Sequence, residues 1–102
     1  MTKVSVMYPN SEGSTFDMNY YTEKHVPLAG NLIGDAVKGV AMAKGLGGPE
    51  NSPAAYTMIA DMYFDSVESF ENSFGPVADK ILADIPNFTN VQPTILISEV
   101  LA

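Results

Sequence analysis

The stretch Ala55-Tyr-Thr-Met-Ile-Ala-Asp-Met-Tyr-Phe64 is the longest strand candidate in the chain. Successive side chains of a strand point to opposite faces of a sheet. Here one face would carry Tyr56, Met58, Ala60, Met62 and Phe64, and the other Ala55, Thr57, Ile59, Asp61 and Tyr63. Both faces are largely apolar, whereas a sheet that faces water on one side has one polar face. We therefore expect this strand to be covered on both faces.

Strand and helix patterns alternate on either side of this stretch. Strands are expected over residues 3–8, 37–44 and 91–101, and helices from Thr15 or Asp17 toward Leu32 and from Asp65 or Ser66 to residue 85. Pro27 is expected to kink or divide the first helix. The order strand, helix, strand, strand, helix, strand is typical of an α+β ferredoxin-like sandwich (βαββαβ). In that fold a four-stranded antiparallel sheet carries both helices on one face.

The length of the chain limits it to one domain. Its 102 residues have room for a single hydrophobic core, and we assign residues 1–102 to one domain. Two helices on one face leave the other face of the sheet bare, although the strands carry apolar side chains on both sides. A second copy packing sheet against sheet is the simplest cover. The sequence therefore predicts a homodimer through the sheet faces.

The composition narrows the partners and cofactors. Five lysines stand against twelve carboxylates, for a net charge of −7, and there is no arginine. Nucleic acids and anionic membranes are bound by clustered Lys and Arg, so both are disfavoured, and a small neutral or weakly acidic ligand fits better. One His and no Cys offer no ligand set for zinc or iron, and we expect no metal and no cofactor. Without a long apolar run or a signal-peptide pattern, we expect a cytoplasmic protein.

His25, the only histidine, is the first candidate for chemistry. Tyr21, His25, Leu28 and Leu32 follow helical spacing and are expected to form one buried stripe. An imidazole in an apolar cavity could act as a general base or acid near neutral pH. The alternative is a core histidine satisfied by a backbone carbonyl, and the spacing alone favours this alternative.

Asp61 and the tyrosines are the other polar candidates. Asp61 alternates with Ile59 and Tyr63 in the longest strand, and burial would raise its pKa unless it is paired. Three roles stay open for it: it could orient His25, accept a substrate proton or hydrogen-bond across the dimer interface. Tyrosine hydroxyls could bind a carbonyl, but an amphipathic core residue explains each tyrosine equally well.

Two segments resemble the EthD family of the dimeric α+β barrel superfamily: Tyr8-Pro9 and Thr15-Phe-Asp-Met-Asn-Tyr-Tyr-Thr-Glu-Lys-His-Val-Pro-Leu28. The shared pattern is a strand ending in Tyr-Pro, a Phe-Asp opening of the helix, a Tyr-Tyr pair and a His-x-Pro. The resemblance implies a ferredoxin-like subunit whose sheet packs against the sheet of a partner. This agrees with the independent inference from the apolar strand faces.

The resemblance also implies a site. Catalytic relatives in this superfamily use a helix histidine and tyrosines in a cavity between helices and sheet. By position this implies His25 as the catalytic residue, with Tyr8, Tyr20 and Tyr21 as substrate-binding supports. The haem-binding relatives are larger and carry their ligand on a different helix, so the resemblance does not imply haem.

Two functions are carried forward. The first is a cofactor-independent enzyme of small-molecule catabolism, of isomerase, cyclase or decarboxylase type. It would act on a small apolar or aromatic carbonyl compound, with His25 as the proton shuttle and Asp61 among the candidate substrate contacts. The alternative is a non-catalytic binding or accessory protein of a degradation pathway.

Overall fold

The sheet has four antiparallel strands in the order β2-β3-β1-β4. The computed structural model describes all residues 1–102. The strands are β1 Thr2–Pro9, β2 Gly39–Lys44, β3 Tyr56–Phe64 and β4 Thr94–Glu99. The ferredoxin-like fold predicted from the sequence is confirmed. The last strand is shorter than predicted, because pairing with β1 starts only at Thr94 and ends at Glu99.

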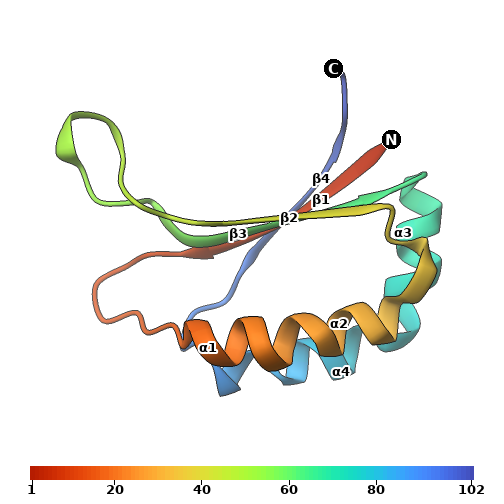
Figure 1. Ribbon diagram of the computed structural model, residues 1–102, viewed down its shortest axis with the longest axis horizontal. Helices are drawn as coiled ribbons and strands as arrows, with labels where there is room; N and C mark the ends of the chain where they lie inside the picture. The colour runs from red at the N-terminus through yellow and green to blue at the C-terminus, as the bar shows by residue number, and fades with distance from the viewer.

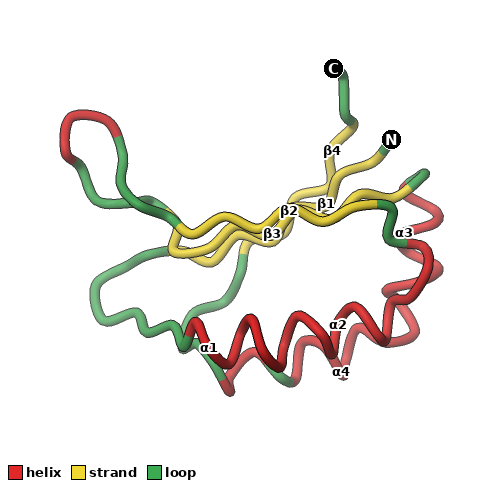
Figure 2. The backbone as a smooth tube through the Cα atoms, in the orientation of Figure 1, coloured by secondary structure: helices red, strands yellow, loops and turns green.

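The helices form a single layer on one face of the sheet, and the other face is uncovered (Figures 1 and 2). The first helical segment comprises α1 Met18–Tyr20, η1 Tyr21–His25 and α2 Val26–Ile33, followed by a short turn, η2 Gly34–Ala36. The second comprises α3 Val67–Phe74, η4 Gly75–Val77, α4 Ala78–Ala83 and η5 Ile85–Asn87. A further turn, η3 Pro49–Asn51, lies in the loop between β2 and β3. None of these helices is long and apolar enough to cross a membrane.

The first helix continues past Pro27 but changes its type there, since the π-helical η1 ends at His25 and α2 begins at Val26 with Pro27 in its first turn. Asp17 is the N-cap, because its side chain accepts a hydrogen bond from the backbone N–H of Tyr20. Pro27 has no N–H, and in a regular α-helix the carbonyl of Glu23 would lose its partner there. The five residues before α2 form a π-helical turn, η1, and the helical ribbon runs from α1 into α2 without a break (Figure 1). A widened turn thus adapts the helix to the proline.

The buried side of this helix follows the predicted stripe only in its first half. Tyr21 and His25 are buried as expected. Leu28 and Leu32 are half-buried, and Ile33 reaches the core instead. Tyr21 and His25 belong to the half of the molecule where Tyr8, Met58, Ile85 and Phe88 pack together. This second core cluster forms the surroundings of the candidate site.

The two faces of the sheet are distinguished by register. Val4 and Tyr8 on β1 are buried under the helices, and so are Met58 and Phe64 on β3. Ser5 pairs with Asp61 and also with Leu96, and Asp61 pairs with Ala41. Leu96, Ser5, Asp61 and Ala41 thus form one row across the sheet. Because side chains alternate along a strand, this row lies on the face away from the helices.

Candidate functional site

A cavity of about 160 Å³ lies between the helix layer and the sheet. Sixteen of its twenty lining residues are hydrophobic, and no Lys, Asp or Glu is among them. An apolar cavity of about 150 Å³ is large enough for a single benzene ring. The polar groups in its wall come from only three side chains: Tyr8 on β1 and Tyr21 and His25 on η1. The cavity therefore suits a small, largely apolar molecule with one polar end.

His25 is buried in the wall of this cavity, with 5% of its surface exposed. Its ring stacks on Tyr21 with a centroid separation of 5.6 Å and lies 4.6 Å from the ring of Phe88. Its Nδ1 atom is 2.9 Å from Oδ2 of Asp84. Nε2 forms no hydrogen bond within the protein. Every fully buried side-chain nitrogen or oxygen atom does have a hydrogen-bond partner, so Nε2 is not fully buried. Nε2 is therefore the ring nitrogen open to a small molecule.

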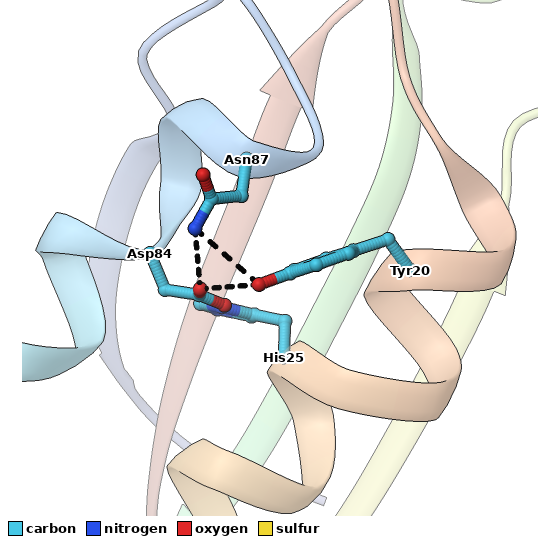
Figure 3. Close-up of polar contacts among 4 residues, drawn as sticks. All are labelled: Tyr20, His25, Asp84 and Asn87. Atoms are coloured by element: carbon cyan, nitrogen blue, oxygen red, sulfur yellow. Dashed lines mark hydrogen bonds and ion pairs between the residues drawn. The ribbon is translucent and has the colours of Figure 1, made fainter.

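Asp84 is held in place by two further donors (Figure 3). Its Oδ1 accepts hydrogen bonds from the Tyr20 hydroxyl at 2.7 Å and from Asn87 Nδ2 at 2.9 Å. Burial alone would raise the pKa of Asp84, but the hydrogen bonds from Tyr20, Asn87 and His25 outweigh it and lower that pKa. The hydrogen bond to Asp84 raises the pKa of Tyr20, which therefore stays a donor.

The state of Asp84 fixes the chemistry of His25. A carboxylate only accepts hydrogen bonds, so Nδ1 of His25 must carry the proton that points toward Oδ2. In the neutral ring, Nε2 then carries a lone pair. When Nε2 takes up a second proton, the negative charge of Asp84 stabilises the imidazolium that forms. The arrangement holds His25 as a base directed away from Asp84.

Tyr8 and Tyr21 supply two hydroxyls beside this base. Each residue is only 2% exposed, and neither hydroxyl bonds to another protein group. Since both residues line the cavity, their hydroxyls are available to a ligand there. Burial raises the pKa of Tyr21 to about 12, and burial together with the nearby Tyr21 raises the pKa of Tyr8. Both hydroxyls are therefore neutral donors at physiological pH.

The structure brings together three of the five predicted site residues. His25, Tyr8 and Tyr21 share the cavity, whereas Tyr20 donates to Asp84 and does not line it. Tyr20 is thus a positioning residue and not a ligand contact. Asp61 lies on the opposite face of the sheet, where it accepts a hydrogen bond from Ser5, so it cannot orient His25. No group of three or more His, Cys, Asp or Glu side chains is close enough to hold a metal ion.

Asp84 and Asn87 belong to the candidate site, although no sequence pattern pointed to them. They flank Ile85 and Pro86 at η5, a stretch that in sequence marks only the end of a helix. Asp84 is 59 positions from His25, and no periodicity connects the two. A carboxylate and an amide on either side of a proline turn are the only signal, and it is a weak one.

Acid should weaken the fold through Asp84. Its pKa in the folded protein is below the ordinary value of 3.8, so the carboxylate stabilises the fold at pH values above its pKa in the unfolded chain. This contribution is lost as the pH falls through the lower, folded-state pKa. Between about pH 7 and pH 3, the free energy of unfolding in urea should therefore fall more for the wild type than for Asp84→Asn. Equal losses in the two proteins would contradict the lowered pKa.

The fold and the site define a ferredoxin-like α+β protein with a histidine-containing cavity under its helices. The EthD domain matches residues 14–92 of this sequence. An EthD-like protein from Ralstonia eutropha JMP134 is 36% identical, with a TM-score of 0.92 over 99% of this chain and 92% of that chain. The chain belongs to the EthD family.

More distant structures share the fold alone. An ethyl tert-butyl ether degradation (EthD) family protein from Bacillus halodurans C-125 is 19% identical, with a TM-score of 0.74 over 99% of both chains. A protein from Arabidopsis thaliana is 14% identical, with a TM-score of 0.69 over 99% of this chain and 95% of that chain. No curated protein matches the sequence significantly. The fold agrees with the dimeric α+β barrel superfamily.

Proposed function

We propose that this protein binds a small neutral carbonyl compound in the cavity and moves a proton on it, with His25 as the base. The observation that carries the proposal is the free Nε2 of a buried histidine whose Nδ1 is fixed by Asp84. A base must lie within reach of the proton that it takes, and His25 lines the cavity with Nε2 as the ring nitrogen that has no protein partner. The chain's own side chains suffice for this step.

The proposed step is an enolisation. Nε2 of His25 takes a proton from the carbon next to the carbonyl, and the electrons of that C–H bond form a C=C bond. The carbonyl π electrons move to oxygen, which becomes an enolate and accepts hydrogen bonds from Tyr8 and Tyr21. The imidazolium then returns its proton to carbon, at the same position or at the far end of the conjugated system. The second outcome is an isomerisation.

The charges around the cavity favour a neutral substrate. None of the five lysines lines it, so no cation could balance a carboxylate or a phosphate there. A charged group buried without a partner is strongly disfavoured. The hydroxyls of Tyr8 and Tyr21 suit a carbonyl oxygen, and the apolar wall suits an aromatic or aliphatic body.

Deuterium exchange tests the proposal without knowledge of the natural substrate. Phenylacetone in D₂O carries acidic protons beside its carbonyl, and proton NMR follows their loss. The proposal predicts that the protein accelerates this exchange. Exchange at the buffer rate, with phenylacetone bound as judged by a shift of the His25 signals, would contradict the enzyme and favour the alternative function.

That alternative, a non-catalytic binding or accessory protein, is favoured by one observation. His25 carries the only basic nitrogen among the side chains that line the cavity, because the hydroxyls of Tyr8 and Tyr21 stay protonated. A second acid or base is therefore missing from the wall. Binding without exchange is the result expected from such a protein.

We also propose that two copies pair through the uncovered faces of their sheets. That face is free of helices (Figure 2). It carries Leu96, which is 52% exposed, next to Ser5, and the exposed Ala41 next to Asp61. An uncovered sheet face with exposed apolar residues such as Leu96 is a typical protein interface. The Asp61 carboxylate would lie within that interface, already hydrogen-bonded to Ser5.

Leu96→Glu should dissociate this homodimer, because the new carboxylate would be buried without a partner. Light scattering after gel filtration is expected to give twice the mass of one chain for the wild type and the mass of one chain for the variant. Leu46→Glu, at a loop position that is 94% exposed, is the control and should remain dimeric. A monomeric wild type would refute the pairing.

A further inference from the structure

A second hollow adjoins the cavity on the side of β4. Its volume is about 480 Å³, and it shares four wall residues with the cavity: Leu82, Ile85, Pro93 and Ile95. It lies where the chain leaves the helix layer after η5 and rises to β4 (Figure 1). Leu82 is 42% exposed and Ile95 is 45% exposed, although both are large apolar residues. The two hollows thus adjoin between α4 and β4, and the residues they share are apolar.

The polar side chains of this second hollow are mostly committed to the protein. Thr89 donates from Oγ1 to the carbonyl of Thr15. Asn90 accepts from the N–H of Thr15 through Oδ1 and donates from Nδ2 to the carbonyl of Gly13. Gln92 is the remaining polar residue, and no charged residue lines the hollow. What the hollow offers a ligand is mainly apolar surface.

The cavity that contains His25 is too small for a large ligand, so a longer ligand would have to extend from it into the second hollow. Asp84, which fixes His25, directly precedes Ile85, and Ile85 belongs to both hollows. His25 lines the same cavity as Ile85, one of the residues through which that cavity adjoins the second hollow. At about 160 Å³ the cavity holds little more than one ring, whereas sites for larger ligands measure about 300–1,000 Å³. The two hollows together fall within that range.

We propose that the substrate is elongated: a carbonyl head beside His25, Tyr8 and Tyr21, and an apolar tail that passes between Leu82 and Ile95 into the second hollow. This inference rests on the proposed function and deepens it. Leu82 and Ile95 then select substrates by tail length, and the head supplies the reacting carbon.

A chain-length series of phenyl ketones tests the proposed channel from the cavity into the second hollow. The probes are 1-phenyl-2-alkanones with the alkyl chain extended from phenylacetone by one to five methylenes, and the measurement is Kd from the shift of the His25 nitrogen signals. Each methylene that enters the channel should tighten binding by about fourfold. The methyl signals of Val91, which lines only the second hollow, should shift with the long ketones and not with phenylacetone.

Two matched variants locate the tail. Gln92→Glu places a carboxylate in the wall of the second hollow alone, and it should reduce the gain with chain length while leaving the affinity for phenylacetone unchanged. Val40→Glu, at the exposed opposite edge of the same cavity, should keep the gain. The channel would be refuted, and the proposed function would stand, if all the ketones bound the wild type with the same Kd. The same conclusion would follow if Val40→Glu were the variant in which affinity no longer rises with chain length. Failure of every ketone to shift His25 would refute both.

Discussion

Replacing His25 with glutamine is expected to slow the exchange of phenylacetone protons by about two to four orders of magnitude, the usual contribution of a general base. Glutamine keeps an amide N–H with which to reach Asp84 but has no basic nitrogen. The loss should therefore appear in the rate and not in the fold. Proton NMR in D₂O gives the rate, and circular dichroism checks the structure.

The control for this variant is Lys24→Gln, an exposed neighbour on the same helical turn that does not line the cavity. It should exchange phenylacetone at the wild-type rate. If His25→Gln retained the wild-type rate, a different group would be the base, and the proposed function would be wrong.

Replacing Asp84 with asparagine should reverse the tautomer of His25. Oδ1 of Asp84 accepts from both Tyr20 and Asn87, so the asparagine oxygen is expected to keep that position. Its NH₂ group then faces Nδ1 of His25 and donates to it. The ring proton must move to Nε2, and the nitrogen in the cavity changes from an acceptor to a donor.

The rate of deuterium exchange is expected to fall strongly, because the corresponding change in a Ser-His-Asp triad lowers turnover by about four orders of magnitude. Nitrogen-15 NMR resolves the tautomer, and the deuterium exchange of phenylacetone measures the loss. Asp79→Asn is the matched control, since Asp79 is an exposed carboxylate on the same helix, α4. An unchanged tautomer in Asp84→Asn would show that Asp84 does not set the state of His25.

The fold could be predicted because its signals are local. The alternation of Ala55 to Phe64 and the helical spacing from Asp17 onward are each visible within one element. The π-helical turn that precedes Pro27 was not predictable, because no local pattern in the sequence marks it. Local rules make proline a helix breaker and do not anticipate this compensation.

The site could be predicted only in part. The helix pattern and the family resemblance led to His25, Tyr8 and Tyr21, but adjacent helical residues point in different directions, so Tyr20 reaches Asp84 instead of the cavity. Asp61 was misplaced for a related reason. Both faces of its strand are apolar, and the sequence does not say which face the helices cover.

Asp84 shows the limit most clearly. Its role arises from the contact between the end of the second helical segment and the π-helical turn of the first, which are far apart in sequence. Such a contact exists only in the folded chain. No charge pattern or spacing near His25 indicated a carboxylate partner.

Nitrogen-15 NMR of the single histidine in the wild-type protein tests the central claim most directly. Near neutral pH, the neutral ring is expected to carry its proton on Nδ1, and the Nε2 signal should move when phenylacetone is added. A proton on Nε2, or an Nε2 signal that ignores the ketone, would contradict the account of His25 as a base directed into the cavity.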